Sequence, residues 1–227
     1  MNNLVKNMAS SVVWKGPRII VDNLDYYLII KSPNCVNSFD TSQIKDISGS
    51  DFIPNLVNNP QFQPDFGGII SFDGTNQHIN TGLSSSSAFF SVNILMKATN
   101  TTGTQVYVGS NNGVNDWWIG LSSGNFVFSA NGSVVNSSYS VGTTSFYLVT
   151  TTFSPDSRKI YINGTLQASA SPVSLSNPGN IHIAKFGDNN TFYAAMSLGA
   201  FIFYSKELNS TEVSQIYNSL NGSYGLI

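Results

Sequence analysis

The chain has 227 residues, of which 41% are hydrophobic, so it suits one domain with a sizeable core and excludes a disordered chain. Only 10% of the residues are charged and the net charge is −2, so no general attraction to nucleic acid or to a membrane surface is expected. Cys35 is the only cysteine, which excludes an intrachain disulfide and a thiolate metal cluster.

The first 21 residues differ in charge from the rest of the chain. They contain three basic residues and no acidic one, so they carry +3, and the remainder carries −5 because the whole chain carries −2. We expect residues 1–21 to form an N-terminal arm and residues 22–227 to form one domain. The arm either pads the domain as a strand or docks on a partner protein. The docking residues would then be Val12, Val13, Trp14, Lys15 and Arg18.

The first predicted strand covers residues 24–30 and is followed by a long polar stretch. Residues 67–81 then have the pattern of a strand, a tight turn and a second strand. Ile70 and Phe72 share one face of the first of these two strands, because successive side chains point to opposite sides. Gly74 supplies the positive φ that the turn requires.

The middle of the chain is rich in β-branched and aromatic residues, which favour strands. The pair Asn163-Gly164 predicts a type I′ hairpin turn, because both residues tolerate positive φ. A Ser-Ser-Gly turn at residues 122–124 joins two more strands as a hairpin. The predicted strands of this region are residues 88–97, 105–109, 117–121, 125–128, 146–153 and 158–166.

The last predicted strands cover residues 181–185 and 198–204, and a helix follows them. Asn209 can cap this helix, with Glu212 three residues later as its partner in a capping box. Residues 221–222, an Asn-Gly pair, are expected to end the helix. The helix buries an apolar stripe formed by Val213, Ile216, Tyr217 and Leu220.

Three landmarks occur in a fixed order: Phe-Asp-Gly-Thr-Asn at 72–76, Tyr-Ile-Asn-Gly at 161–164, and the short helix at 209–220. Through these landmarks the chain resembles the laminin-G-like, concanavalin A-like domains from about residue 24 to about residue 220. The resemblance implies an all-β fold, a two-sheet antiparallel jelly-roll sandwich with one short C-terminal helix. Residues 24–66 resemble the opening of a group of these domains that is frequent in virion proteins of tailed phages.

Some domains with this fold are glycoside hydrolases, which need two carboxylates about 5–10 Å apart. The only glutamates of the chain, Glu207 and Glu212, belong to the start of the predicted helix. Asp40 and Asp46 lie in the polar stretch, where no strand would hold them rigidly. We therefore expect that the chain is not an enzyme.

The resemblance implies calcium as the one plausible ion, because laminin-G-like domains often bind it near the rim of the sandwich. Asp116 and Asp188 are the candidate ligands, since carboxylate oxygens suit this ion. No cofactor is required by any motif in the chain. His78 and His182 are expected to have structural roles, because a zinc site needs further ligands that converge on the metal.

A glycan site needs an exposed aromatic ring with polar neighbours. Trp117 and Trp118 are adjacent on a predicted strand, so one points inward and the other outward. Trp117 shares a face with apolar residues and belongs to the core, which leaves Trp118 as the platform. Alternatively, Trp118 is covered by a loop or by a neighbouring subunit. The candidate glycan-binding residues are Asn115, Asp116, Trp118, Asp188 and Asn189.

Our main prediction from the sequence is a non-enzymatic structural or decoration protein on the capsid or tail of a tailed phage. Its partners would be other virion proteins and further copies of itself, and its location would be the virion assembled in the host cytoplasm. No signal peptide and no membrane-spanning run is visible. The alternative is a carbohydrate-binding adhesin that attaches to glycans of the host surface, and a glycoside hydrolase ranks third.

Overall fold

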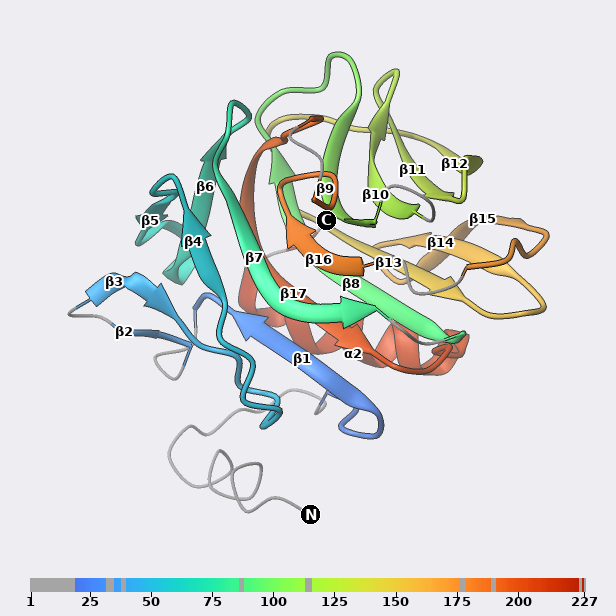
Figure 1. Cartoon of the computed structure of the whole chain (residues 1–227), viewed down its shortest axis with the longest axis horizontal. Helices are drawn as coiled ribbons and strands as arrows, with labels where there is room; N and C mark the ends of the chain where they lie inside the picture. The colour runs from blue at the N-terminus through green and yellow to red at the C-terminus, as the bar shows by residue number, and fades with distance from the viewer. Residues whose placement is uncertain are drawn as a thin grey trace.

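Two antiparallel sheets pack face to face, and the helix α2 lies along the far side of strands β8 and β17 (Figure 1). The computed structural model describes residues 19–31, 35–37, 40–85, 88–112, 116–175, 179–188, 191–224 and 226. The predicted all-β sandwich with one C-terminal helix is confirmed. Within the described residues, no helix has the length and the apolar character that crossing a membrane requires.

One sheet, here called the helix-side sheet, has the strand order β15-β14-β13-β8-β17-β6-β5, and β1 also pairs with β17. Strand β17 can serve both β1 and β6 because each pairs with a different half of it. The strands are β1 (Leu24–Ile29), β5 (Gln61–Gln63), β6 (Ile69–Asp73), β8 (Phe90–Ala98), β13 (Tyr147–Phe153), β14 (Arg158–Ile162), β15 (Thr165–Ala170) and β17 (Ala195–Tyr204).

The other sheet, here called the open sheet, has the strand order β12-β11-β10-β9-β16-β7-β4. Its strands are β4 (Asn55–Val57), β7 (His78–Ser85), β9 (Gln105–Asn111), β10 (Asp116–Ser122), β11 (Asn125–Ala130), β12 (Ser133–Ser140) and β16 (Gly179–Ile183). A separate two-stranded ribbon and one turn of 3₁₀ helix complete the elements. These are β2 (Val36–Asn37), β3 (Asp40–Ile44) and η1 (Asp65–Gly67).

Aromatic side chains fill the core between the two sheets. Phe90 stacks on Phe153 and Phe203 with ring centroids 5.0 and 5.9 Å away, and Trp117 of the open sheet lies 5.0 Å from it. Phe72 also belongs to this core, as the alternation along β6 predicts. Burial of rings from both sheets fixes the register, because a slip by one residue would turn every side chain to the other face.

The predicted hairpin turns are confirmed by their backbone angles. Asn163 and Gly164 have φ of 50° and 78°, the positive values that a type I′ turn needs. Ser123 and Gly124 have φ of 51° and 77° in the turn between β10 and β11. The Asn163 side chain also accepts a hydrogen bond from the Leu148 N–H at 2.9 Å, which ties this turn to β13.

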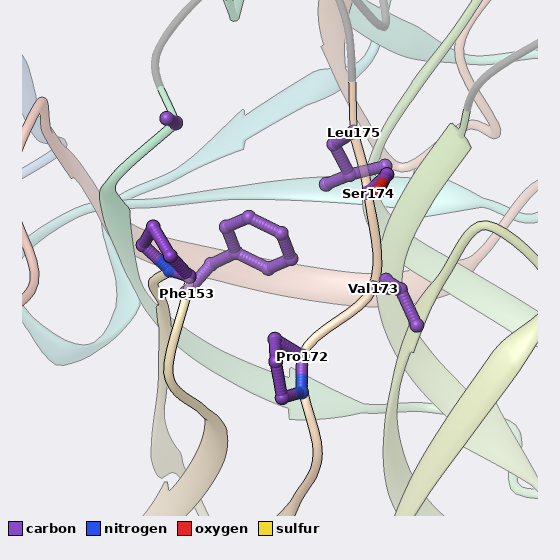
Figure 2. A pocket seen from close by; sticks show the side chains of 7 residues that line it. Phe153, Pro172, Val173, Ser174 and Leu175 are labelled. Atoms are coloured by element: carbon purple, nitrogen blue, oxygen red, sulfur yellow. The ribbon is translucent and has the colours of Figure 1, made fainter.

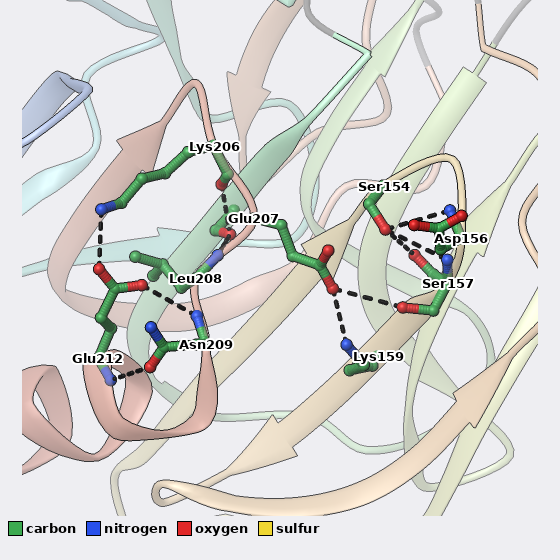
Figure 3. Close-up of polar contacts among 10 residues, drawn as sticks. Ser154, Asp156, Ser157, Lys159, Lys206, Glu207, Leu208, Asn209 and Glu212 are labelled. Carbon is green, nitrogen blue, oxygen red and sulfur yellow. Dashed lines mark hydrogen bonds and ion pairs between the residues drawn. The ribbon is translucent and has the colours of Figure 1, made fainter.

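Helix α2 (Ser210–Tyr224) begins with the predicted capping box, which Figure 3 shows. The Glu212 N–H donates to the Asn209 side chain at 3.0 Å, and the Asn209 N–H donates to the Glu212 carboxylate at 2.9 Å. The apolar stripe of α2 packs on the helix-side sheet, where Val213 and Ile216 are fully buried. Among the described elements, the outer face of the open sheet therefore has no helix on it.

The prediction that residues 221–222 end the helix is wrong, because α2 continues to Tyr224. Tyr224 is buried, its ring lies 6.0 Å from that of Phe146, and its hydroxyl donates to the Gly199 carbonyl at 2.9 Å. Tertiary packing of this last turn therefore outweighs the low helix propensity of Gly222.

The start of α2 is also tied to the helix-side sheet by charged residues. Glu207 accepts from the Lys159 ammonium of β14 at 2.7 Å and from the Ser157 hydroxyl at 3.3 Å (Figure 3). Glu212 pairs with the Lys206 ammonium at 2.8 Å. Both glutamates of the chain thus have structural partners, as their place in the sequence suggests.

Asp46 is held more rigidly than its polar surroundings in the sequence suggest. It is buried, and its carboxylate accepts from the backbone N–H groups of Tyr27 and Ser48, both at 2.9 Å. The expectation of a loosely held carboxylate is therefore wrong for Asp46, which links the polar stretch to β1. The expectation that no strand holds Asp40 is also wrong, because Asp40 begins β3 and pairs there with Asn37. Its side chain lies outside the described residues.

Candidate functional site

The outer face of the open sheet carries a row of residues that crosses four strands and reaches a fifth. Trp118 of β10 pairs with Ser129 on one side and with Gly109 on the other. Gly109 in turn pairs with His182 of β16, and His182 pairs with Asn80 of β7. These residues share a face because their sequence neighbours point into the core. The row brings a tryptophan and a histidine onto one surface of the sheet.

The two adjacent tryptophans point to opposite faces of the sheet, as the alternation along a strand predicts. Trp117 is fully buried in the core, and Trp118 is half-buried on the outer face. The Trp118 ring meets the edge of Phe186, with centroids 6.5 Å apart and planes at 76°. Phe186 can lie there because Gly109 has no side chain. A Cβ on Gly109 would be only 3.2 Å from the Phe186 ring.

The segment between β16 and β17 folds back over β9 and supplies further groups to this face. The Ala184 N–H donates to the Tyr107 carbonyl at 2.8 Å, and the Val106 N–H donates to the Phe192 carbonyl at 3.2 Å. Ala184 and Phe192 have φ of 64° and 54°, a region that residues with side chains seldom occupy. Strain of this kind persists only where surrounding contacts impose it, and it is frequent at binding sites.

Two histidines lie together beside this segment. The rings of His78 and His182 are 5.6 Å apart, and His78 is 6.0 Å from the Tyr193 ring. His182 Nε2 is 2.9 Å from a carboxylate oxygen of Asp188, so a neutral imidazole with its proton on Nε2 donates to Asp188. Burial lowers the pKa of both histidines, which favours their neutral forms.

Lys185 is buried next to the two histidines, with only 5% of the residue exposed. Burial lowers the pKa of its ammonium, and the negative charge of Asp188 acts against this effect. The positive charge of Lys185 in turn lowers the pKa of His78 and His182. We call the combined group the outer-face cluster. It consists of His78, Trp118, His182, Lys185, Phe186, Asp188, Phe192 and Tyr193.

The structure brings together some of the site residues that the sequence predicts. Asp116 pairs with Asn111 in the ladder between β9 and β10, and the Asp188 N–H donates to the Asn111 carbonyl at 3.5 Å. Both candidate aspartates thus lie next to Asn111, and Trp118 is two residues from Asp116. Asn115 and Asn189, the other predicted glycan-binding residues, lie outside the described residues.

Calcium binding by Asp116 and Asp188 stays a prediction. In the described part of the chain, no three His, Cys, Asp or Glu side chains come together in a way that could hold a metal ion. One carboxylate oxygen of Asp116 is buried and has no hydrogen-bond partner in that same part of the chain. Asp188 is the more accessible of the two, since its side chain is 56% exposed.

Lys185, Phe186, Phe192 and Tyr193 are site residues that the sequence reasoning missed. A signal was present, because three aromatic residues fall within eight positions of a segment that follows a predicted strand. The proximity of His78 to His182 has no such signal. It depends on the pairing of β7 with β16, which are about a hundred residues apart in the chain.

The predicted docking arm cannot be placed on this surface. Val12, Val13, Trp14, Lys15 and Arg18 all lie outside the described residues. Residues 19–21 of the predicted arm are described, and two of them pack on the helix side of the molecule. Ile19 and Ile20 contact the cluster under α2, and the Ile20 carbonyl accepts from the Tyr204 hydroxyl at 3.0 Å.

A cavity of about 340 Å³ lies elsewhere, at the end of β13. Figure 2 shows Phe153, Pro172, Val173 and Leu175 around it, with Ser174 as the one hydroxyl. Binding sites for small polar molecules combine apolar walls with several well-placed polar groups. The described lining of this cavity lacks such groups, so the outer-face cluster is the better candidate for a sugar. That lining is Ala88, Phe153, Pro155, Pro172, Val173, Ser174 and Leu175.

Solved structures with the same fold include several binding domains. The binding domain of Paraclostridial mosquitocidal protein 1 superposes with a TM-score of 0.69 at 21% identity, over 88% of this chain and 52% of that one. The binding domain of botulinum neurotoxin DC in complex with SialylT gives 0.67 at 20% identity, also over 88% and 52%. The chain therefore spans about half the length of these toxin domains.

A third structure is matched over nearly its whole length. Domain 4 of AbnA, a GH43 extracellular arabinanase from Geobacillus stearothermophilus, was solved in complex with arabinotriose. It superposes with a TM-score of 0.67 at 15% identity, over 86% of this chain and 98% of that one. At such low identities these likenesses establish the fold alone.

A comparison with curated protein sequences gives no significant match. The family model of the concanavalin A-like lectin/glucanases superfamily matches residues 73–214, which is more than half of the 227 residues. This range includes all but the first residue of the first landmark, the whole of the second and the first half of the third, in their expected order. The chain belongs to the concanavalin A-like lectin/glucanases superfamily.

Proposed function

We propose that the chain is a non-enzymatic carbohydrate-binding module that holds its ligand on the outer face of the open sheet. The observation that carries this proposal is the outer-face cluster itself. Trp118 and the half-exposed Phe192 offer aromatic surface for the C–H face of a sugar ring. The exposed Asp188 carboxylate beside them can accept hydrogen bonds from sugar hydroxyls.

The comparisons support this function more than the virion role. The arabinanase domain carries most weight, since the chain matches 98% of it and it was solved with an oligosaccharide. The toxin domains carry less weight, because their ligands could contact the half that the chain does not match. They nevertheless favour glycans on a host cell surface as the target. No comparison supports a role in a capsid or tail.

A non-enzymatic role agrees with the way the two glutamates of the chain are used. A glycosidase needs one carboxyl group with a raised pKa to donate a proton and a second one near it. Glu207 and Glu212 are occupied by Lys159, Lys206 and the capping box at the start of α2. We therefore expect glycans to be bound and released without cleavage.

The test is a glycan array followed by calorimetry with the best ligand. Trp118→Ala and Phe192→Ala should each weaken binding by about tenfold, the loss expected when one aromatic contact of about 1.5 kcal/mol is removed. Phe66→Ala is the matched control. Phe66 is 53% exposed with φ of 53°, almost the same as Phe192 at 51% and 54°, but it packs on Phe146, which directly precedes β13 of the helix-side sheet.

Unchanged binding in both outer-face variants would move the site elsewhere on the molecule. An array without any bound glycan would overturn the proposed function. Repeating the array with a chelator tests the calcium prediction at Asp116 and Asp188. Loss of binding in chelator would establish a calcium-dependent module, and equal binding would remove the metal from the proposed site.

A further inference from the structure

Lys185 is a buried cation without an ion-pair partner among the described residues. Three ion pairs between a lysine and a carboxylate occur in that part of the chain, and Lys185 takes part in none of them. No hydrogen bond from its ammonium is found there either. Asp188, the acid whose charge acts on Lys185, is instead paired with His182 at 2.9 Å. The ammonium thus lacks a counter-ion at ion-pair distance.

Lys185 is buried mainly through its apolar stem. Its ammonium keeps contact with solvent, because it is not among the fully buried polar atoms without a partner, so an anion from solution can reach it. The stretches of sequence next to the cluster offer no further acid. Residues 113–115 and 189–190 consist of Gly, Val and Asn only. A negative charge for Lys185 is therefore best supplied from outside the protein.

A second polar atom without a partner lies in the same place. His182 Nδ1 is buried and has no hydrogen-bond partner in the described part of the chain. His78 lies 5.6 Å away from this imidazole, and its own Nδ1 is 3.1 Å from the Asn76 carbonyl. The two imidazoles and the ammonium form a compact polar group. Buried polar groups normally have partners, so His182 Nδ1, an acceptor when Nε2 carries the proton, indicates a missing hydrogen-bond donor such as a sugar hydroxyl.

We propose that the sugar held by the outer-face cluster is an acidic one, whose carboxylate pairs with Lys185. This inference rests on the proposed function and names the class of its ligand. The aromatic rings of Trp118, Phe186 and Phe192 contact the sugar ring, and the Lys185 ammonium favours a ligand that carries a negative charge. Sialic acids and uronic acids both present a carboxylate on a pyranose ring, so either one supplies the charge that the inference requires.

The experiment compares each acidic ligand with a neutral counterpart by calorimetry on the full chain. The pairs are sialyllactose with lactose, and trigalacturonate with its methyl ester. The acidic member should bind at least about tenfold more tightly, the usual value of a charge-assisted hydrogen bond. Which of the two acidic ligands binds identifies the source of the carboxylate.

Lys185→Met removes the charge and keeps most of the side-chain volume. It should abolish the preference for the acidic ligand, so that the acidic and the neutral ligand of each pair bind with similar affinity. Lys97→Met is the matched control. Lys97 belongs to β8 of the helix-side sheet, and its ammonium also lies next to aromatic rings, those of Phe66 and Phe146. This control should keep the preference. The methyl ester tests the same contact without any change to the protein, so a folding defect in Lys185→Met would not obscure the result.

Two outcomes separate this inference from the function on which it rests. Equal binding of acidic and neutral ligands, with no effect of Lys185→Met, would overturn the acidic-sugar inference and keep the carbohydrate-binding function. Absence of binding to every glycan would overturn the function itself. Tight acidic binding that depends on Lys185 would support both.

Discussion

At the scale of single residues, two glycines allow the segment after β16 to lie close against β9. Gly109 leaves room for the Phe186 ring, and Gly187 lies directly on Asn111. A Cβ on Gly187 would be 2.6 Å from the Asn111 Cβ and still closer to its backbone nitrogen. Gly187 also has φ of 51°, which a side chain disfavours. The position of Asp188 depends on this contact.

Gly187→Ala should therefore destabilise the protein more than a glycine change that meets only backbone strain. Gly132 has φ of 74°, and no atom lies within 4 Å of the place that a Cβ would take there, so Gly132→Ala isolates the strain, about 1 kcal/mol. We expect Gly187→Ala to lose about 1–3 kcal/mol more, the usual cost of overpacking. Urea denaturation measures both, and equal losses would show that the segment moves aside freely.

The burial and direction of single side chains were predictable only where a repeating pattern, such as the alternation of side chains along a strand, determines them. The division of Trp117 and Trp118 between core and surface follows from strand alternation, and so does the outward direction of His182. The burial of Lys185 does not follow, because the residue lies beyond the end of β16, where no period applies. Its environment is created by long-range hydrogen bonds that fold the segment over β9.

At the scale of elements, helix α2 was predicted at its start and mispredicted at its end. The start is determined by side chains within one turn, the Asn209 and Glu212 capping box, and such a signal can be read from sequence. The end is determined by packing of Tyr224 on Phe146 and Gly199, which only the folded chain brings together. Short edge strands such as β4 and β5 were missed for the same reason.

The capping box gives a direct test of how α2 is held. Asn209→Ala removes the acceptor of the Glu212 N–H and should lower the free energy of unfolding by about 1 kcal/mol. Ser214→Ala is the control on the exposed side of the helix, where the hydroxyl donates only to the Ser210 carbonyl. Thermal melts should separate the two variants, and an identical midpoint for both would contradict a stabilising cap.

At the scale of the whole molecule, the fold was predictable because its landmarks are local turns and one helix. The candidate functional face was only partly predictable, because it gathers side chains from β7, β10, β16 and the segment before β17. Most of the pairings that join these elements are long-range. Of the predicted glycan-binding residues, Trp118, Asp116 and Asp188 lie on one side of the molecule, around β9 and β10.

The buried histidines predict how global stability responds to pH. The pKa of His78 and of His182 is lowered by burial below its unfolded value of about 6.5, so the unfolded chain binds protons first as the pH falls. The contribution of the two histidines to the free energy of unfolding should therefore be fully present near pH ~7.5, above that unfolded pKa. It should decrease as the pH falls toward ~5.5, below that pKa. Lys185, which opposes histidine protonation, and Asp188, which favours it at His182, are the charged neighbours.

The double variant His78→Gln and His182→Gln checks this assignment. Its melting temperature should depend less on pH over the same interval than that of the parent, because the two titrating groups are gone. The same slope in both proteins would place the acid sensitivity elsewhere. Measurements should stop above about pH 5, where carboxyl groups begin to take up protons.

The position of the helix also determines which face the molecule would present when it is attached to a surface. Ile19 and Ile20 at one described end, and Leu226 at the other, pack with α2 on the helix side. The outer-face cluster belongs to the opposite sheet. A tether attached at Ile19 or at Leu226 would therefore leave the proposed ligand surface facing away from the support. Copies fixed side by side through their ends would present parallel faces, and many weak contacts could then add up to strong multivalent attachment.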